Sequence, residues 1–166
     1  MPLPFVNKNA GLSVDDQRQI VVNEAQKWIN TPYLSNADVC GAGVDCGMLL
    51  VRVFVDAGFV APFDPRPYPA QWALHQSAEI YLSIVQQFTT EITPQKPLPG
   101  DIALFKFGRC YAHGAIVTEW PWLIHANPNA DRRAPCRVDN AETNSDLMFR
   151  PPRFFTIFAA TTREQR

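Results

Sequence analysis

A cysteine, Cys46, stands directly before a long apolar run, and this stretch constrains the fold more than any other. The residues before it, 41–44, are small and turn-prone, and the apolar residues after it recur at helical spacing. The spacing predicts a buried helix over 46–57 with Cys46 in its first turn. The free N–H groups and dipole of a helix start stabilise a thiolate, so we expect a lowered pKa for this thiol. The alternative is a packing cysteine, because cysteine is among the most buried residue types.

Size and composition describe a compact globular chain. It has 166 residues, of which 46% are hydrophobic and 19% charged, and this composition excludes a disordered chain. The formal net charge of −1 gives no indication of a nucleic-acid-binding surface. No segment reaches the ~18 apolar residues of a membrane span, and the N-terminus lacks signal-peptide features. We expect a single domain over 1–166, with an irregular arm at 1–12, synthesised in the cytoplasm without a signal peptide.

Apolar periodicity and turn residues predict helices first and strands afterwards. Ser13 resembles a helix start. The expected helices cover 14–29, 46–57 and 70–88. The expected strands cover 102–107, 114–119, 122–126, 147–150 and 154–159, and loops are expected at 34–44, 61–69 and 128–145. This order favours an α+β domain in which N-terminal helices pack on an antiparallel sheet.

Two of the three histidines fall in the strand-rich half of the chain. His113 stands at the start of one predicted strand, and His125 stands near the end of the next. If these strands are antiparallel neighbours, the two side chains meet at the same edge of the sheet. With Cys46 they match the logic of thiol hydrolases, in which an imidazole takes the thiol proton and a third polar group fixes its tautomer.

Five short motifs occur in a fixed order along residues 18–128. They are Thr31-Pro32-Tyr33, Asp45-Cys46, Pro99-Gly100-Asp101, His113-Gly114-Ala115-Ile116-Val117 and Ile124-His125-Ala126. With these motifs the sequence resembles the NlpC/P60 family of papain-like cysteine peptidases, and most of all its phage-associated branch of cell-wall peptidases. The resemblance implies a papain-like NlpC/P60 fold.

The resemblance also implies roles for individual residues. Cys46 would be the nucleophile, His113 the general base and His125 the polar residue that orients His113. Tyr33 would lie beside the thiol, where its hydroxyl helps to bind the oxyanion. We count Asp45 among the substrate-binding candidates, although its position directly before Cys46 favours a role in holding the loop rather than in the reaction.

The family cleaves amide bonds in bacterial cell-wall peptides, typically beside D-γ-glutamyl and diaminopimelate residues. The resemblance therefore implies peptidoglycan stem peptides as substrate, possible phage tail proteins as partners, a virion-associated role, and no metal or organic cofactor. Two rival functions stay open. The first is a non-catalytic tail or assembly module on the same fold, and the second is a thiol amidase or acyltransferase with another substrate.

The sequence departs from the family pattern directly after the cysteine. The family usually continues Asp-Cys-Ser-Gly, whereas this chain has Gly47 and Met48. Gly47 removes a hydroxyl that would cap the helix or line the pocket, and Met48 adds bulk where a small residue is usual. Both changes bear on substrate fit, but neither removes a catalytic group.

Aromatic and basic residues outside these motifs are candidates for the substrate cleft. Tyr68, Trp72 and Trp122 are the aromatic residues that we expect as cleft walls. Arg132, with Arg133 beside it, has the geometry to hold a carboxylate of an anionic peptide, and the alternative is an ordinary solvated pair.

The other cysteines allow two further interpretations. Cys40 lies six residues before Cys46. The two thiols could pair with each other, or Cys40 is a loop cysteine without a role. A zinc site could be imagined from Cys110, Cys136 and the two histidines, because zinc binds cysteine and histidine side chains. Their spacing, however, is not that of a zinc finger or ribbon.

Overall fold

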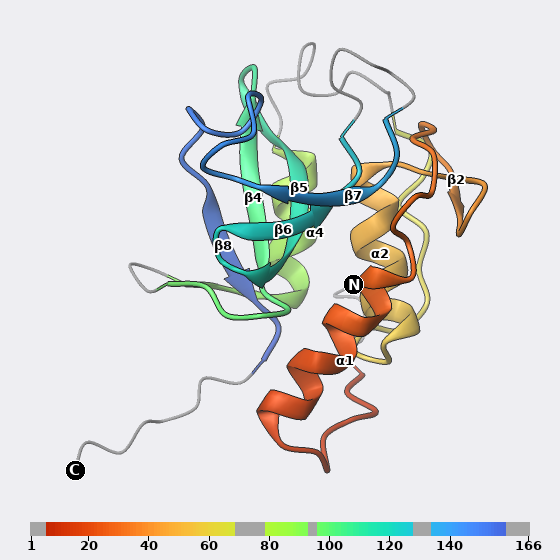
Figure 1. The fold of residues 1–166 in the computed structure, drawn as a ribbon. Helices are drawn as coiled ribbons and strands as arrows, with labels where there is room; N and C mark the ends of the chain where they lie inside the picture. Colours follow the sequence, from red (N-terminus) through yellow and green to blue (C-terminus); the bar gives the residue numbers. More distant parts are fainter. Residues whose placement is uncertain (1–5, 69–78, 93–95, 128–133, 159–166) are drawn as a thin grey trace.

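The structure of the protein is a computed structural model, which describes residues 6–68, 79–92, 96–127 and 134–158. Helices come first and the sheet follows, which confirms the α+β class (Figure 1). The elements are α1 (Val14–Gln26), β1 (Asp38–Val39), β2 (Gly43–Val44), α2 (Cys46–Asp56), α4 (Ile80–Phe88), β3 (Thr90–Ile92), β4 (Ile102–Phe107), β5 (Cys110–Glu119), β6 (Trp122–His125), β7 (Arg137–Asn140) and β8 (Arg153–Thr156).

The main sheet contains six antiparallel strands in the order β3-β8-β4-β5-β6-β7. The ten-residue strand β5 is its centre, because it pairs with β4 and β6 and is contacted by all three described helices. Alternate side chains of these strands point to opposite faces. One face joins the helices in the main core, and the other carries a second apolar cluster that Ala141 and Leu147 help to close.

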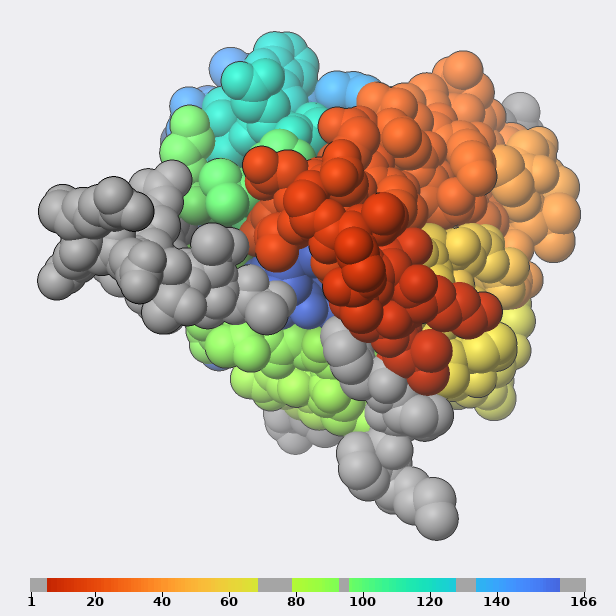
Figure 2. All heavy atoms as spheres, turned by 90° about the horizontal axis from the view of Figure 1, so that it is seen from below, coloured from red at the N-terminus to blue at the C-terminus, as the bar shows by residue number. Residues whose placement is uncertain are grey.

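Helix α1 lies across the junction between the sheet and the rest of the N-terminal half. In the view of Figure 2, α1 and the segment before it (red) run between the strands (green to cyan) and residues 30–68 (orange to yellow). Val21 and Ala25 of α1 are fully buried in the main core. No helix among the described residues is both long and apolar enough to cross a membrane.

Helix α2 is the buried helix that the apolar run predicts, and it begins at Cys46 as expected. Asp45 caps it, since the Oδ1 of this residue accepts a hydrogen bond of 2.8 Å from the Met48 N–H. Leu49 and Val53, one turn apart, have no exposed surface. Gly58 follows with a φ of +81°, a conformation that glycine adopts without strain and that ends helices.

The other two helices differ from their predicted ranges. Ser13 caps α1 through the Asp16 N–H, as expected, but α1 ends at Gln26 rather than at 29. Turns follow, and Asn30 adopts a φ of +73°, which does not continue a helix. Of the helix predicted over 70–88, the structure shows α4 at Ile80–Phe88, and residues 69–78 lie outside the described part of the chain.

Four of the five strand predictions are confirmed, most with shifted ends, and one is wrong. The strand predicted at 154–159 corresponds to β8, which starts one residue early and ends at Thr156. The predicted strands at 102–107, 114–119 and 122–126 correspond to β4, β5 and β6, and β5 starts four residues early. The predicted strand at 147–150 is a turn in which the Arg150 N–H bonds to the Leu147 carbonyl. The predicted loop at 128–145 contains β7, and the predicted loop at 34–44 contains the β1–β2 hairpin.

The strand β7 was missed for a physical reason. β7 has the sequence Arg-Val-Asp-Asn, which has low strand propensity. It forms a strand because it pairs antiparallel with β6, with Leu123 opposite Asp139 and His125 opposite Arg137. Such pairing depends on tertiary contacts that local sequence does not encode.

The Pro99-Gly100-Asp101 motif ties the sheet to α1. Asp101 is 1% exposed, and its Oδ1 lies 2.9 Å from the Nη1 of Arg18 on α1. Its other oxygen accepts a hydrogen bond of 2.8 Å from the Leu98 N–H. Gly100 has a φ of +84°, so a side chain at this position would strain the turn. The motif is therefore structural in this chain.

We expect Asp101→Ala to lower the free energy of unfolding by about 3 kcal/mol, because it leaves a largely buried guanidinium without its carboxylate. Urea denaturation measures this change. The matched control is Asp56→Ala, which removes the exposed partner of Arg52 and should cost under about 1 kcal/mol. Equal losses in the two variants would contradict the structural role of Asp101.

Candidate active site

The Cys46 thiol lies at the start of α2 against the backbone on both sides of His113. Its Sγ donates to the Ala112 carbonyl oxygen at 3.6 Å, and the Gly114 N–H donates to the sulfur. These backbone groups are available because the pairing of β6 with β5 begins only at Ile116. The thiol therefore takes the place along β5 where hydrogen bonds from a longer β6 would have been.

Asp45 is a buried anchor beneath the thiol. Besides capping α2, its carboxylate accepts hydrogen bonds from the Asn36 N–H at 2.6 Å and from the Tyr68 hydroxyl at 2.7 Å. These contacts fix the preceding loop, as its position in the sequence favoured. The side chain is 3% exposed, and its assignment as a substrate ligand stays a prediction.

His113 and His125 meet, as their places on consecutive strands predicted. The Nε2 of His113 lies 2.9 Å from the Nδ1 of His125, and both rings are buried. The His113 ring also stands edge-on to the Phe107 ring, with centroids 5.5 Å apart. One ring nitrogen of each histidine is thus committed to the other, and their orientations are fixed.

Burial keeps both the thiol and the imidazoles neutral. Burial, followed by the nearby Asp45 carboxylate, raises the pKa of the Cys46 thiol to about 12. The expectation of a lowered thiol pKa is therefore wrong for the free protein, because desolvation outweighs the helix start and its N–H groups. Burial likewise lowers the pKa of His113 well below 6.5, helped by the neighbouring His125, Arg137 and Arg150. A neutral imidazole is the form that accepts a proton.

Three tyrosines surround the first turn of α2. Tyr33 lies on the segment that bridges to Val44, and burial with the nearby Cys46 and Asp45 raises the pKa of its phenol. Its hydroxyl therefore remains a hydrogen-bond donor. The Tyr81 hydroxyl donates to the Cys46 carbonyl oxygen at 3.0 Å, so α4 also holds the nucleophile's backbone.

Two glycines permit these tyrosines to approach. A Cβ on Gly114 would overlap the Tyr81 hydroxyl and lie 2.7 Å from a methyl carbon of Leu50. A Cβ on Gly47 would lie 3.0 Å from the Tyr68 hydroxyl, which occupies the space where the family's serine would project. Met48 is 1% exposed in the core, so its bulk does not project toward the substrate.

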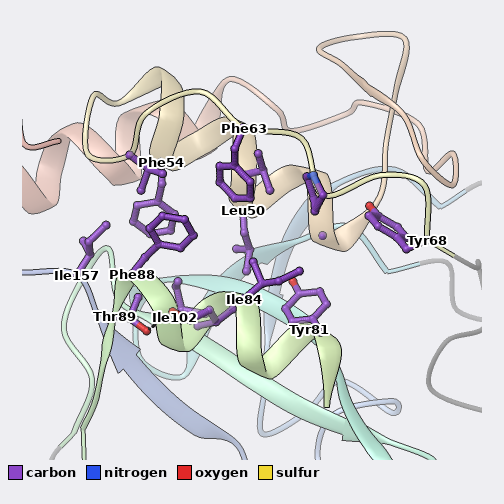
Figure 3. Close-up of a pocket in the computed structure, with 15 residues that line it drawn as sticks. Leu50, Phe54, Phe63, Tyr68, Tyr81, Ile84, Phe88, Thr89, Ile102 and Ile157 are labelled. Carbon is purple, nitrogen blue, oxygen red and sulfur yellow. Dashed lines mark hydrogen bonds between the residues drawn. The ribbon is translucent and has the colours of Figure 1, made fainter. Parts of the chain in front are cut away.

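An apolar pocket adjoins the site on the side of Gly47. Its walls come from α2, from residues 60–68 and from α4, and Figure 3 shows Phe54, Phe63 and Phe88 gathered at the end away from Tyr68. The phenols of Tyr68 and Tyr81 lie at the other end (Figure 3). The pocket is suited to an uncharged, apolar group.

The structure brings some of the other expected cleft residues to the site but not all. Tyr68 reaches it through Asp45. Trp122 pairs with Glu119, about 20 Å along β5 from His113 at ~3.3 Å per residue, so the structure places it away from the thiol. Trp72 and Arg132 lie outside the described residues.

The cysteines form neither a Cys40–Cys46 pair nor a zinc site among the described residues. Cys40 is exposed and donates to the Lys27 carbonyl oxygen at 3.2 Å, and no disulfide joins it to the buried Cys46. In the described part of the chain, no three His, Cys, Asp or Glu side chains are grouped to hold a metal ion. The zinc set suggested by Cys110 and Cys136 is not formed.

Sequence reasoning missed two polar residues at the site. Asp139 contacts His125 at 2.7 Å from a segment that was expected to be a loop. Tyr81 was assigned only to the apolar face of a helix, yet its hydroxyl contacts the backbone of Cys46. A tyrosine on an apolar helix face is the only signal that pointed to the second contact, and nothing local pointed to the first.

We expect the protein to lose stability as the pH falls below about 6.5. Burial holds the pKa values of both His113 and His125 below 6.5 in the folded state, whereas the unfolded chain takes up these protons. Each histidine that stays neutral in the folded protein lowers the free energy of unfolding by up to about 1.4 kcal/mol at pH 5.5. Urea denaturation at pH 7.5 and 5.5 measures the loss, which should be smaller in His113→Gln. An identical pH dependence in both proteins would contradict this account.

Comparison with known proteins identifies the fold. No family model matches the sequence. A curated relative, the gamma-DL-glutamyl hydrolase of Bacillus subtilis strain 168, is 31% identical over 85 residues. This alignment covers 51% of the chain and only 17% of that protein's length.

Solved structures match over most of the chain. The NlpC/p60 domain of the peptidoglycan hydrolase SagA has a TM-score of 0.57 and 20% identity, covering 84% of this chain and 97% of that one. The peptidoglycan hydrolase RipB of Mycobacterium tuberculosis has a TM-score of 0.56 and 14% identity, covering 90% and 70%. RipD of the same organism, described as a non-catalytic NlpC/p60 domain protein adapted to peptidoglycan binding, has a TM-score of 0.55 and 12% identity, covering 86% and 98%. The chain thus has the NlpC/P60 fold that its motifs implied.

Proposed function

We propose that this chain, built on the NlpC/P60 fold, is a cysteine peptidase that hydrolyses amide bonds in bacterial cell-wall peptides. One observation carries the proposal. The Cys46 thiol lies against the backbone on both sides of His113, whose ring is held by His125. Nucleophile, base and orienting group are the three parts that thiol-mediated acyl transfer requires.

The reaction follows from these groups. His113 takes the thiol proton while the Cys46 sulfur attacks the carbonyl carbon, so that the S–H bond breaks as the S–C bond forms. The imidazolium then gives that proton to the leaving amine and an acyl-enzyme remains. Water attacks the thioester with His113 again as base, which releases the acid and restores the thiol.

The oxyanion of this reaction needs hydrogen-bond donors. The Tyr33 phenol keeps its proton, since burial and the nearby Cys46 and Asp45 raise its pKa. We assign it to the oxyanion together with a backbone N–H near Cys46, because donors at this position act mainly on the transition state.

The proposed substrate is the stem peptide of peptidoglycan, cleaved at the D-γ-glutamyl-diaminopimelate bond. This choice is supported by the likeness to SagA and RipB, which are described as peptidoglycan hydrolases. The Bacillus subtilis relative is named a γ-glutamyl hydrolase, and it supports an amide of a γ-glutamyl group. The phage-associated branch, tail-protein partners and a virion location stay predictions.

Two other functions each have an observation in their favour. A binding or assembly module is favoured by the burial of Cys46 and by the raised pKa of its thiol, and RipD shows that the fold occurs in a protein described as non-catalytic. An amidase or acyltransferase for another substrate is favoured by the apolar pocket beside Gly47.

The deciding experiment incubates the purified protein with peptides that contain D-γ-glutamyl-diaminopimelate and identifies the products by mass spectrometry. We expect cleavage at that bond, and we expect Cys46→Ala to lower the rate at least about 1,000-fold. Cys40→Ala, which removes an exposed thiol, is the matched control and should retain the activity.

Failure of this experiment separates the alternatives. No cleavage, with Cys46 alkylated quickly near neutral pH, would favour an amidase or acyltransferase. No cleavage and a sluggish thiol would overturn the enzyme proposal and leave the binding module.

Tyr33→Phe tests the oxyanion assignment. Because the phenol would act on the transition state, we expect kcat to fall by about 100-fold while KM changes little. Steady-state kinetics on the same peptide measure both constants. Tyr111→Phe, on the same strand as His113, is the control, and a change confined to KM would assign Tyr33 to ground-state binding instead.

A further inference from the structure

Asp139 extends the pair of histidines to a third side chain. Its Oδ2 lies 2.7 Å from the Nε2 of His125, and the Nδ1 of the same ring lies 2.9 Å from the Nε2 of His113. The three residues come from the consecutive strands β7, β6 and β5. They form an unbroken hydrogen-bonded chain that ends at the proposed base.

The carboxylate of Asp139 is itself held in place. The ladder sets Asp139 opposite Leu123, which directs it to the face of the sheet that carries His125. Its Oδ2 also lies 2.8 Å from the Nε of Arg137 and accepts a hydrogen bond of 3.1 Å from the Asn144 Nδ2. The side chain is 24% exposed, so most of its surroundings are protein.

The ionisation of Asp139 fixes the tautomers of both rings. Burial alone would raise the pKa of this carboxyl, but its hydrogen bond and charge interaction with His125, together with Arg137, lower it below 3.8. An ionised carboxylate only accepts, so the Nε2 of His125 must carry the hydrogen and its Nδ1 must accept. The Nε2 of His113 must then donate, and its Nδ1 keeps the lone pair.

We infer that Asp139 is a positioning residue, which acts through His125 to make the Nδ1 of His113 the basic nitrogen of the site. This role rests on the proposed function for its catalytic meaning. When the Cys46 S–H bond breaks, a new N–H bond forms at that nitrogen and His113 becomes an imidazolium. The proton remains on His113 until it passes to the leaving amine, and Asp139 stays ionised throughout as a countercharge two hydrogen bonds away.

The countercharge matters because cations also face the histidines. Arg137 on β7 and Arg150 on the turn after Leu147 both disfavour a protonated His113. On the acidic side, Asp139 and Asp146 favour protonation of His125. On the α2 side, the charged group near the thiol is the Asp45 carboxylate. Asp139 is the carboxylate that joins this set by a direct hydrogen bond to a ring.

Histidine side-chain NMR tests the tautomers without any substrate. Long-range ¹⁵N–¹H spectra at pH 7.5 distinguish the two nitrogens of each ring, and the chain has only three histidines. His75→Gln assigns the third signal. We expect both His113 and His125 as the Nε2–H form in the wild type and in Asp139→Asn, whose side-chain oxygen still accepts. In Asp139→Leu, we expect the Nδ1–H form to become populated.

Peptide cleavage separates the charge of Asp139 from its hydrogen bond. We expect kcat/KM to fall about 10-fold in Asp139→Asn, which loses only the charge, and about 100-fold or more in Asp139→Leu. The acid limb of the pH profile should move to lower pH in both, because the lost carboxylate lowers the pKa of His113. Asp56→Asn, which changes an exposed carboxylate paired with Arg52 outside the site, is the control and should change kcat/KM less than twofold.

The outcomes separate this role from the function on which it rests. Unchanged tautomers in Asp139→Leu, or an unshifted acid limb in both variants, would overturn the positioning role even if the wild type cleaves peptide. The predicted tautomer change in a protein that cleaves no peptide would support the positioning role and overturn the peptidase proposal. If Asp139→Leu does not fold, the isosteric Asp139→Asn decides. An unchanged rate and acid limb in that variant would overturn the role.

Discussion

The contact between the first turn of α2 and the centre of β5 is the interaction on which the rest of the structure depends. It joins a thiol and a carbonyl of Cys46 to the backbone of β5 and to the Tyr81 hydroxyl. Gly114 makes the approach possible, because a side chain there would overlap that hydroxyl. A shift of the helix by even an ångström would separate the nucleophile from the strand that carries its base.

Burial gives the site its chemical character. Desolvation disfavours a thiolate and an imidazolium alike, so the resting pair is neutral. A neutral pair is consistent with proton transfer that accompanies attack rather than precedes it. The same burial lowers the free energy of unfolding in acid. The unfolded chain binds protons at both histidines, whereas the folded protein keeps them neutral. The neutral resting state of the pair and the acid sensitivity therefore share one cause.

The second face of the sheet supports the site from behind. His125 and Asp139 stand there beside an apolar cluster, and the segment from Ala141 to Arg150 closes over them. Arg150 reinforces this cover, since its guanidinium stacks 4.0 Å from the Phe107 ring and donates to the Lys106 carbonyl. The helices hold the nucleophile, and this polar layer holds the base. The fold brings the two together at the single strand β5.

The sequence by itself determined the helix that begins at Cys46, the α+β order and the meeting of His113 with His125, because periodicity, capping and strand order are local signals. Tertiary structure decided the rest. It made a strand of the polar segment Arg137–Asn140 by pairing it with β6, and thereby placed Asp139 on His125. It also reversed the expected thiol pKa, because desolvation depends on what surrounds a group and not on where the group stands in a helix.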